Sequence, residues 1–385
     1  MASHSYKPED VFWGQLGGCL EALEAGTTTI VDTTISHTLP STVNNAALSA
    51  TISSGIRSIF CYCPIGRVKT WKPFEMEEEF LPAWIFEQLT SLCKAVPFAE
   101  GRVTMGFAFD SFYLPKDVVV NIFNQVRGLG IKTITSHYVP SLLSGSTVDL
   151  LESFGLLDKV ILLSHAIPLN DSDAQKLQSV GASISSTPDT ELQMGHGWPV
   201  CFQENARSIS SLGIDCHSNN TGSIVAQMKI PAKVRVSTQD AFRLRTIGGA
   251  RAIKISDQTG SLEEDKIADP VIWDTASPAI IYGAEEDPIA AIILRSAPSY
   301  IEAVIVDGQF SKRNGKLVTT KLDLKLMPNM EHERSEVQWR DVATELLESR
   351  QSISDREKAS GADDREAGFE NIVRIFGTDK DKLVY

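Results

Sequence analysis

Short apolar runs alternate with longer polar stretches along most of this chain. Between residues 15 and 275 one pattern recurs: an apolar, β-rich run, a polar loop, and a segment whose apolar residues return every three to four positions. Such a pattern is typical of βα units. Seven runs are predicted to be strands, at residues 27–35, 58–64, 103–109, 132–137, 160–166, 182–187 and 213–216. Several are apolar almost throughout, as expected for parallel strands covered by helices.

The segments between these strands have the periodicity of amphipathic helices. Helices are predicted at residues 12–25, 43–54, 80–95, 116–129, 171–180 and 200–212, and several end at a glycine suited to a left-handed cap. The stretch after Asp215 has room for only one good helix, at residues 238–252. Strands that alternate so regularly with helices favour an α/β fold of the TIM-like (β/α) barrel type over a mixed sheet.

The text changes in the last third of the chain. Residues 257–322 hold short apolar runs separated by turn residues, which predicts a small β domain. From Glu333 onward the sequence is charged and has helical periodicity. We therefore predict a barrel at residues 10–256, part of a β domain at 257–325 and a charged helical tail at 326–385.

Composition narrows the range of partners. Acidic residues outnumber basic ones 49 to 36, giving a net charge of −13, which argues against binding to nucleic acid or to an anionic membrane surface. The sequence begins without a secretory signal pattern and has no apolar stretch long enough to cross a bilayer, so we expect a cytoplasmic location. The six cysteines form no CxxC pair, which predicts neither a disulfide framework nor a thiolate metal site. A homodimer is the default assembly.

Polar residues stand where three of the predicted strands end. His137 ends the fourth, His165 lies within the end of the fifth, and Asp215 lies near the end of the seventh. In a parallel barrel these ends meet at one face, where catalytic residues are found. Imidazole and carboxylate groups are ligands for Zn²⁺ or Fe²⁺, and a bound ion activates water. Each histidine taken singly is as readily explained as a hydrogen-bonded core residue.

Other candidates flank these three. His217 follows Asp215 almost directly, and His196 lies between two glycines beside Trp198, so all three of His196, Trp198 and His217 are candidate substrate-binding residues. The simpler alternative is a turn for the glycines and ordinary packing for the tryptophan. Asp110 also follows a strand and is expected on the same face, although a loop cap is the simpler explanation.

Motifs of three other enzyme classes are missing from the sequence. It contains no GxSxG elbow, no phosphate-binding P-loop and no GxGxxG after a predicted strand. Serine hydrolase, nucleotide hydrolase and dinucleotide-dependent activities therefore lack their characteristic parts.

Several segments, in their order and spacing, resemble the amidohydrolase superfamily, specifically its branch of cytosine and guanine deaminases and triazine chlorohydrolases. The resemblance spans roughly residues 10–320. It is carried by LEALEAGTTTIVDTTISH at 20–37, ITSHYVP at 134–140, the stretch from LLSHAIP to TPDTELQMG at 162–195, LGIDCHSNN at 212–220, GSLEEDKIADPVIWD at 260–274 and VIVDGQF at 304–310.

This resemblance implies a metal-dependent hydrolase acting on carbon–nitrogen, non-peptide bonds of a small molecule. It implies that His137 matches the metal-binding histidine of the fifth barrel strand. His165 matches the sixth-strand histidine, which binds metal or contacts substrate and water. Asp215 matches the eighth-strand aspartate, which binds metal and assists attack by hydroxide. One divalent metal is expected, zinc first and iron second. Residues 182–195 match the segment that lines the substrate pocket.

The sequence also departs from the family pattern. It lacks the His-x-His of the first strand, so that strand, with part of the composite β domain, is expected to lie outside this chain. Pro140 stands where deaminases of this branch carry a glutamate acid, and residues 227–234 are short for the helix that follows the eighth strand. The alternative is a catalytically impaired or metal-free barrel: a truncated gene product, or a binding or lyase-like paralogue that uses His137, His165 and His217.

Overall fold

A computed structural model gives the arrangement of most of the 385-residue chain. It describes residues 5–35, 42–70, 73, 75–139, 145–216, 220–233, 236–330, 332–361, 364, 366 and 370.

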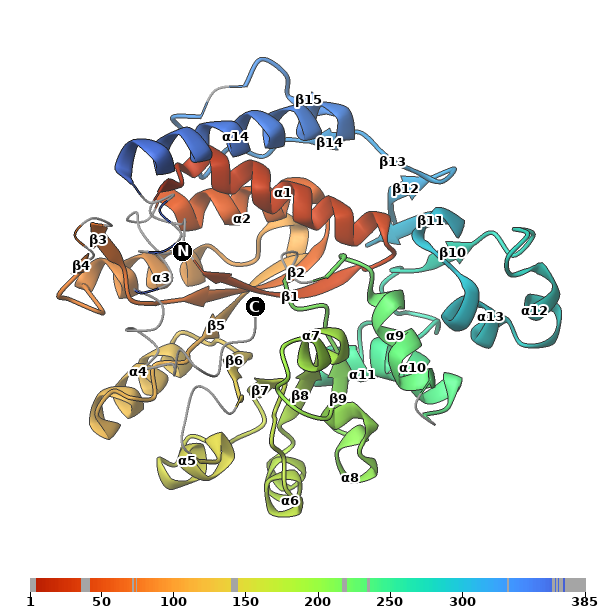
Figure 1. The fold of residues 1–385 in the computed structure, drawn as a ribbon, viewed down its shortest axis with the longest axis horizontal. Helices are drawn as coiled ribbons and strands as arrows, with labels where there is room; N and C mark the ends of the chain where they lie inside the picture. Colours follow the sequence, from red (N-terminus) through yellow and green to blue (C-terminus); the bar gives the residue numbers. More distant parts are fainter. Residues whose placement is uncertain are drawn as a thin grey trace.

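A seven-stranded parallel sheet forms the centre of the molecule (Figure 1). Its strands lie side by side in the order in which they occur in the chain, as the sequence predicts. They are β1 (Thr29–Ile35), β2 (Arg57–Cys63), β5 (Val103–Ala108), β6 (Ile134–His137), β7 (Ile161–Ser164), β8 (Ser183–Ser186) and β9 (Ser210–Leu212). The sheet is curled like an incomplete barrel, and within the described residues β1 and β9 each pair with one neighbouring strand.

Both faces of the sheet are covered, which explains the nearly continuous apolar runs. All seven residues of β2 are buried. Phe60 belongs to the apolar cluster that includes the helices outside the sheet, whereas Ile59 and Cys61 pack with Ala252 at the end of α11 (Ile247–Ala252). Strand residues therefore alternate between a helix-facing and an inward-facing layer, as in a parallel barrel.

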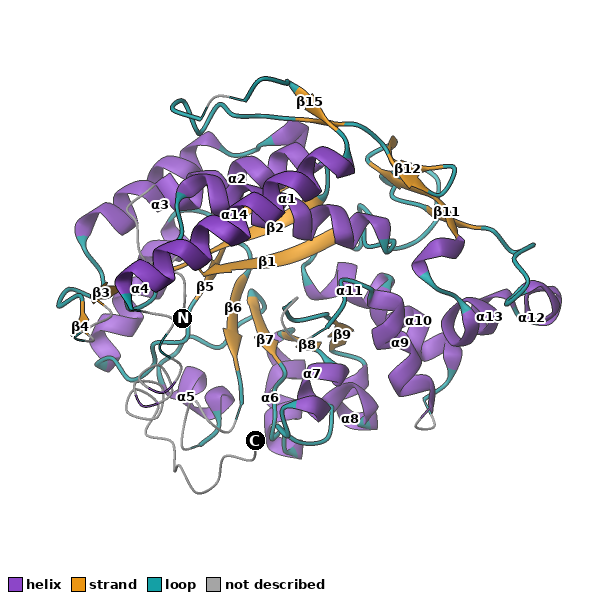
Figure 2. Cartoon of the chain, turned by 45° about the horizontal axis from the view of Figure 1, so that its top comes forward, coloured by secondary structure: helices purple, strands orange, loops and turns teal. Residues whose placement is uncertain are grey.

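Helices follow the strands and form the outer layer (Figure 2). Those associated with the first six strands agree with the predicted positions to within a few residues, except that a short helix, α5, forms between β6 and β7. They are α1 (Pro8–Glu24), α2 (Thr42–Ser54), α3 (Ala83–Ala95), α4 (Lys116–Gly128), α5 (Thr147–Ser153) and α6 (Asp171–Val180). A short hairpin, β3 (Val68–Thr70) and β4 (Glu75–Met76), lies between β2 and α3.

The prediction for residues 200–216 is wrong. The expected helix at 200–212 is replaced by a 3-10 turn (Val200–Phe202), the single turn α8 (Glu204–Arg207) and strand β9, and the expected strand at 213–216 is a loop. Ser210 and Ser211 are polar yet buried in β9 because the Ser210 hydroxyl donates to the Ala206 carbonyl at 2.8 Å and the Ser211 hydroxyl donates to the Ile184 carbonyl at 2.9 Å. Because their hydroxyls are satisfied, these serines are buried without forming an apolar run, which hides this three-residue strand in the sequence.

The expectation of a single helix after Asp215 is also wrong. Three helices follow: α9 (Ile224–Lys233), α10 (Thr238–Arg245) and α11 (Ile247–Ala252). Helix α9 is stabilised by Val225 and Met228, which pack with Ala241 of α10 and Ile293 of α13 (Pro288–Arg295). The predicted helix at 238–252 is broken at Thr246, where ψ is −99°.

A second, antiparallel sheet is built from the segment after residue 257. Its strands are β10 (Val271–Trp273), β11 (Ile301–Val306), β12 (Gln309–Arg313) and β13 (Lys316–Leu317), followed by the pair β14 (Thr320–Lys321) and β15 (Glu336–Val337). Two helices that the sequence interpretation missed, α12 (Ile281–Glu286) and α13 (Pro288–Arg295), interrupt it. Asp287 caps α13 by accepting from the Ala290 amide at 2.9 Å, and Pro288 is its first residue.

The last described helix, α14 (Trp339–Ser360), packs against the first, α1. Gly17 of α1 permits this approach, because a β-carbon there would come within 2.8 Å of the Leu346 side chain. Asp10 accepts a hydrogen bond from Ser349 at 2.5 Å and pairs with Arg356. The predicted charged helix therefore forms part of the main body, while the domain boundaries at 256 and 325 remain predictions.

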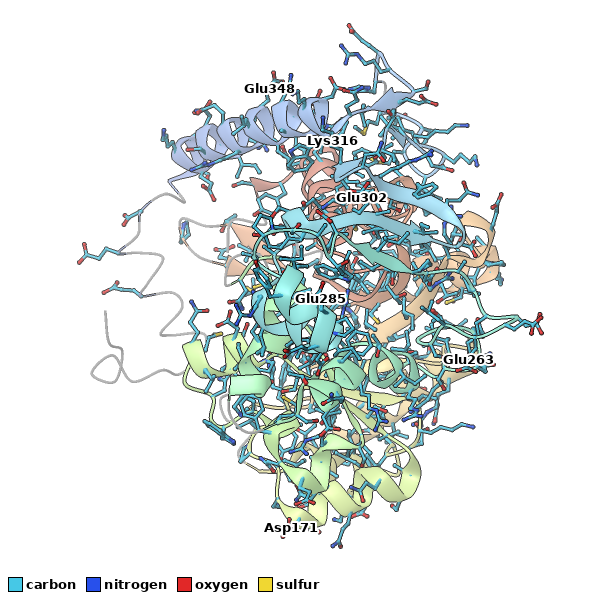
Figure 3. The ribbon with its side chains drawn as sticks, turned by 90° about the vertical axis from the view of Figure 1, so that its right-hand side faces the viewer. Asp171, Glu263, Glu285, Glu302, Lys316 and Glu348 are labelled. Atoms are coloured by element: carbon cyan, nitrogen blue, oxygen red, sulfur yellow. The ribbon has the colours of Figure 1, made fainter. Side chains whose placement is uncertain are left out.

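The acidic character of the chain is spread over the outer elements (Figure 3). Asp171 at the start of α6, Glu285 on α12, Glu302 on β11 and Glu348 on α14 are all exposed. Within the described residues, none of the helices combines the length and the apolar character needed to span a bilayer.

Candidate active site

The carboxyl ends of β5, β6, β7 and β8 bring together polar side chains that lie far apart in the sequence. Asp110 follows β5, His137 ends β6, His165 follows β7 and Thr187 follows β8. These strands are neighbours in the parallel sheet, so their ends open onto the same edge. We call this group, together with Glu191 and His196, the candidate site.

His137 is held by Asp110. Its ring Nδ1 lies 2.7 Å from Asp110 Oδ2, and its backbone amide donates to Asp110 Oδ1 at 2.7 Å. The hydroxyl of Ser136 donates to the same Oδ1 at 3.0 Å. Both side chains of the pair are 30% exposed, so the imidazole is fixed in orientation yet remains accessible.

The Asp110–His137 pair shifts both pKa values. Burial disfavours the charged imidazole, but the hydrogen bond to Asp110 and the negative charges of Asp110 and Asp215 raise the pKa of His137 above its usual value. Burial also disfavours the Asp110 carboxylate, yet the bonds from His137 and Ser136 and the nearby imidazole lower the pKa of Asp110. Each group therefore stabilises the charged form of the other.

His165 lies in a tight turn immediately after β7. Its φ is +66° and that of Ala166 is +56°, an unusual left-handed pair for residues other than glycine. The turn is tied to the next strand because the His165 amide donates to the Ser185 carbonyl at 2.9 Å. The ring is stacked on that of His137, with 5.6 Å between centroids and 29° between planes.

The Nδ1 atom of His165 faces Thr187 and Glu191. It lies 2.9 Å from the Thr187 hydroxyl and 3.5 Å from Glu191 Oε1. In both histidines, therefore, Nδ1 is occupied by a protein partner. In the part of the chain that the structure describes, neither Nε2 has a hydrogen-bond partner.

His196 extends the row of imidazoles. Its ring centroid is 5.6 Å from that of His165, with 54° between the planes. Gly197, at φ +138°, allows the loop to approach, because a β-carbon there would lie 2.8 Å from the Ile167 side chain. Burial, and then the neighbouring His165, lower the pKa of His196. The glycines around His196 thus serve both a turn and a close approach.

Trp198 and Asp215 border the site without direct contacts to its imidazoles among the described interactions. Trp198 is 56% exposed and meets Phe202 edge to face, with 5.1 Å between centroids. Asp215 was predicted to end a strand, but it lies three residues beyond β9, exposed, with φ +61°. Its charge nevertheless acts on His137 and His196. His217 and Pro140 lie outside the described residues.

The donor types suit a divalent metal. Imidazole Nε2 atoms and a carboxylate are ligands that zinc and iron accept, and a carboxylate on the far nitrogen of a ligating histidine is a common supporting arrangement. Among the described residues, however, no three histidine, cysteine, aspartate or glutamate side chains converge closely enough to hold an ion.

Sequence interpretation missed two members of the site and undervalued a third. Asp110 had the correct position but was more simply explained as a loop cap. Thr187 and Glu191 carried one signal: a Thr-Pro pair opening a short helix, α7 (Pro188–Gln193), with an acidic residue in its first turn. That signal indicates a helix start and does not show that the glutamate turns toward His165.

Comparisons with known proteins agree with the resemblance found in the sequence. The model of the amidohydrolase family matches residues 129–311. A 5-methylthioadenosine/S-adenosylhomocysteine deaminase of Pyrococcus abyssi is 26% identical over 328 residues, which cover 81% of this chain and 73% of that protein. A 5'-deoxyadenosine deaminase of Methanocaldococcus jannaschii is 23% identical over 331 residues, 81% of this chain and 74% of that protein.

Solved structures with a similar fold include a deaminase and a triazine hydrolase. An adenosine deaminase of Xanthomonas campestris with bound zinc has a TM-score of 0.70 at 17% identity, covering 92% of this chain and 76% of that chain. Atrazine chlorohydrolase of Arthrobacter aurescens in complex with zinc has a TM-score of 0.68 at 16% identity, with 91% and 78% covered. The likeness confirms the barrel fold.

Proposed function

We propose that this chain, which resembles the amidohydrolase superfamily and its branch of deaminases and triazine hydrolases, is a metal-dependent hydrolase of a carbon–nitrogen, non-peptide bond in a small molecule. One observation carries the proposal. His137 and His165, stacked at adjacent strand ends, have Nδ1 bound to protein partners and Nε2 without one among the described residues.

His137 and His165 are the residues that would hold a divalent ion through Nε2, with Asp215 as the third protein ligand. Zinc is the first choice, since it is bound in both of the similar structures described above, and iron is the second. When bound, the ion supplies Lewis acidity and lowers the pKa of water toward neutrality. The anchored Nδ1 atoms fix the orientation of both rings, as supporting partners do for metal-ligating histidines.

Asp215 is the proposed base, with His165 as the second catalytic group. Its exposed carboxylate lies on the loop after β9, close enough for its charge to raise the pKa of His137. In this role it removes a proton from the attacking water and delivers it to the leaving nitrogen. His196 and Trp198, and by sequence proximity His217, would contact the substrate.

The relatives suggest which substrates to try first. They are named for deamination of 5-methylthioadenosine, S-adenosylhomocysteine and 5'-deoxyadenosine, and similar structures are those of triazine hydrolases. Pro140 stands where the branch's deaminases have a glutamate acid. We therefore propose hydrolysis in general, and screening of aminopurine nucleosides beside halogenated triazines.

The second candidate is a metal-free or catalytically impaired barrel that binds a small molecule. The observation in its favour is that the described ligating side chains do not converge on one point. This candidate predicts ligand binding that is unaffected by a chelator. The first predicts hydrolysis that a chelator abolishes and Zn²⁺ restores.

Metal content of the purified chain separates the two. Elemental analysis should find about one ion per chain in the parent and in the control His332→Ala, whose histidine lies outside the site, because a catalytic site binds one zinc through three protein ligands. The His137→Ala and Asp215→Asn variants should lose it. An absence of metal from all four proteins, after incubation with Zn²⁺, would contradict the first candidate.

We also infer a cytoplasmic, homodimeric enzyme. The six cysteines are all free, which fits a reducing compartment. Closed twofold dimers are the commonest assembly among soluble homo-oligomers. Fractionation of the cells of origin and light scattering of the purified protein test the two statements separately.

A further inference from the structure

Glu191 is a fully buried carboxylate at the back of the candidate site. It lies in α7 with none of its surface exposed. A buried carboxylate is costly unless hydrogen bonds compensate it. Glu191 Oε1 accepts the Thr187 amide at 2.7 Å and Oε2 accepts the Ser186 hydroxyl at 2.9 Å. These two bonds orient the carboxylate along the carboxyl end of β8, toward His165.

The backbone of His165 is fixed by a hydrogen bond, but that bond does not determine which ring nitrogen carries the proton. Its ring is 5% exposed, and Nδ1 lies 2.9 Å from the Thr187 hydroxyl. A hydroxyl both donates and accepts, so Thr187 alone is compatible with a proton on either nitrogen of the imidazole. The second group near Nδ1 is Glu191 Oε1, at 3.5 Å. An ionised carboxylate only accepts, so it favours a proton on Nδ1.

We propose that Glu191 is a positioning residue whose buried negative charge, acting beside Thr187, keeps the proton of His165 on Nδ1 and leaves the Nε2 lone pair facing the candidate site. The usefulness of that lone pair rests on the proposed function, since Nε2 would bind the ion. The tautomer itself does not. Glu191 thereby orients the ring of His165 through Nδ1, as Asp110 orients that of His137. The two sites differ because Glu191 acts beside the Thr187 hydroxyl and is buried.

The substitution Glu191→Gln removes the charge while keeping the size of the side chain. Its amide oxygen still accepts from the Thr187 amide, and the Ser186 hydroxyl reverses to accept from the amide nitrogen. Glu204→Gln is the matched control, because it makes the same chemical change at an exposed position on α8. Thr187→Val is the second variant: it removes the hydroxyl and leaves the carboxylate.

The test is long-range ¹H–¹⁵N correlation of histidine-labelled, chelator-treated full-length protein, with His165 assigned through His165→Gln. The parent, Glu204→Gln and Thr187→Val should all show His165 protonated on Nδ1. Glu191→Gln should show a mixture, or the proton on Nε2. A parent protonated on Nε2, a Glu191→Gln variant identical to the parent, or loss of the tautomer in Thr187→Val would each overturn the proposal. If Glu191→Gln does not fold, the parent and Thr187→Val spectra still decide.

Zinc titration of the same proteins connects the tautomer to the function. Glu191→Gln should bind zinc about 10- to 100-fold more weakly than the parent and Glu204→Gln, the usual effect of removing a group that supports a metal ligand. Equal affinities would overturn the assignment of Glu191 to metal support. If the parent binds no zinc, the proposed function fails, and the spectra show separately whether the tautomer assignment holds.

Discussion

The two ends of the parallel sheet use ion pairs in opposite ways. At the amino end, Arg57 of β2 binds Asp269 in two places, with Nε to Oδ2 at 2.9 Å and Nη2 to Oδ1 at 3.2 Å. Their side chains are 9% and 3% exposed. At the carboxyl end, His137 binds Asp110 at 2.7 Å, but both side chains are 30% exposed.

The two pairs differ in whether their hydrogen-bonding atoms are all used within the described part of the protein. Asp269 also accepts the Asp307 amide at 2.7 Å and the Thr259 hydroxyl at 3.4 Å, so both its oxygens are used within the protein. His137 has one ring nitrogen committed and the other without a hydrogen-bond partner among the described residues. A saturated, dry pair joins the barrel to the second sheet, whereas an unsaturated, accessible pair can bind a ligand.

The largest expected effect tests the saturated end. Arg57→Ala leaves Asp269 buried and unpaired, so we expect a loss of about 3–5 kcal/mol in the free energy of unfolding. Denaturant titration measures it, with Lys176→Ala as control, because Lys176 forms an exposed pair with Asp149 and should change the midpoint far less. The metal content of the folded fraction of Arg57→Ala should equal that of the parent. Loss of the metal without loss of stability would reverse the comparison.

A smaller effect is expected at the unsaturated end. Asp110→Asn keeps the shape of the side chain but removes the charge that holds His137, so metal affinity should fall about 10- to 100-fold. The free energy of unfolding should fall by no more than about 1–2 kcal/mol, because the pair is partly solvated. Zinc titration and denaturant titration on the same sample give both values. A stability loss as large as that of Arg57→Ala would mean that both ends are structural.

The smallest effect is expected at the rim. Trp198→Ala removes a half-exposed ring, so the free energy of unfolding should change by only about 0.5 kcal/mol. If Trp198 contacts substrate, KM should rise while metal affinity stays unchanged. Steady-state kinetics with the best substrate from the screen, together with zinc titration, measure both. An unchanged KM would restrict the candidate site to the imidazoles and carboxylates at the strand ends.

His137 and His165 were predictable from sequence for a physical reason. His165 follows an apolar run and His137 follows a run rich in β-branched residues, each enough to mark a strand, and parallel strands bring their ends to one edge. The order of all seven strands in the sheet follows from the same repeating pattern. Local periodicity suffices wherever burial makes a strand apolar.

The same reasoning could not predict the position of Asp215 relative to its strand or the role of Glu191. β9 buries two serines whose hydroxyls are satisfied by carbonyls, so its periodicity is weak, and the strand was placed three residues too late. The role of Glu191 depends on how α7 folds back onto β8, a tertiary contact that spacing along the chain does not contain. Partners of the ligands are harder to predict than the ligands because they need only be near in space.

The pairing of α1 with α14 joins two parts of the chain that are synthesised at different times. Asp10 and Arg356, which pair across these helices, are separated by 346 residues. A ribosome adding about 5 to 20 residues per second needs roughly 20 to 70 s to produce the second partner after the first. During that interval the Gly17 face of α1 lacks the Leu346 side chain that packs on it in the folded protein. That face of α1 is therefore covered only late in synthesis, although α2, which follows it directly in the chain, packs on the same helix early.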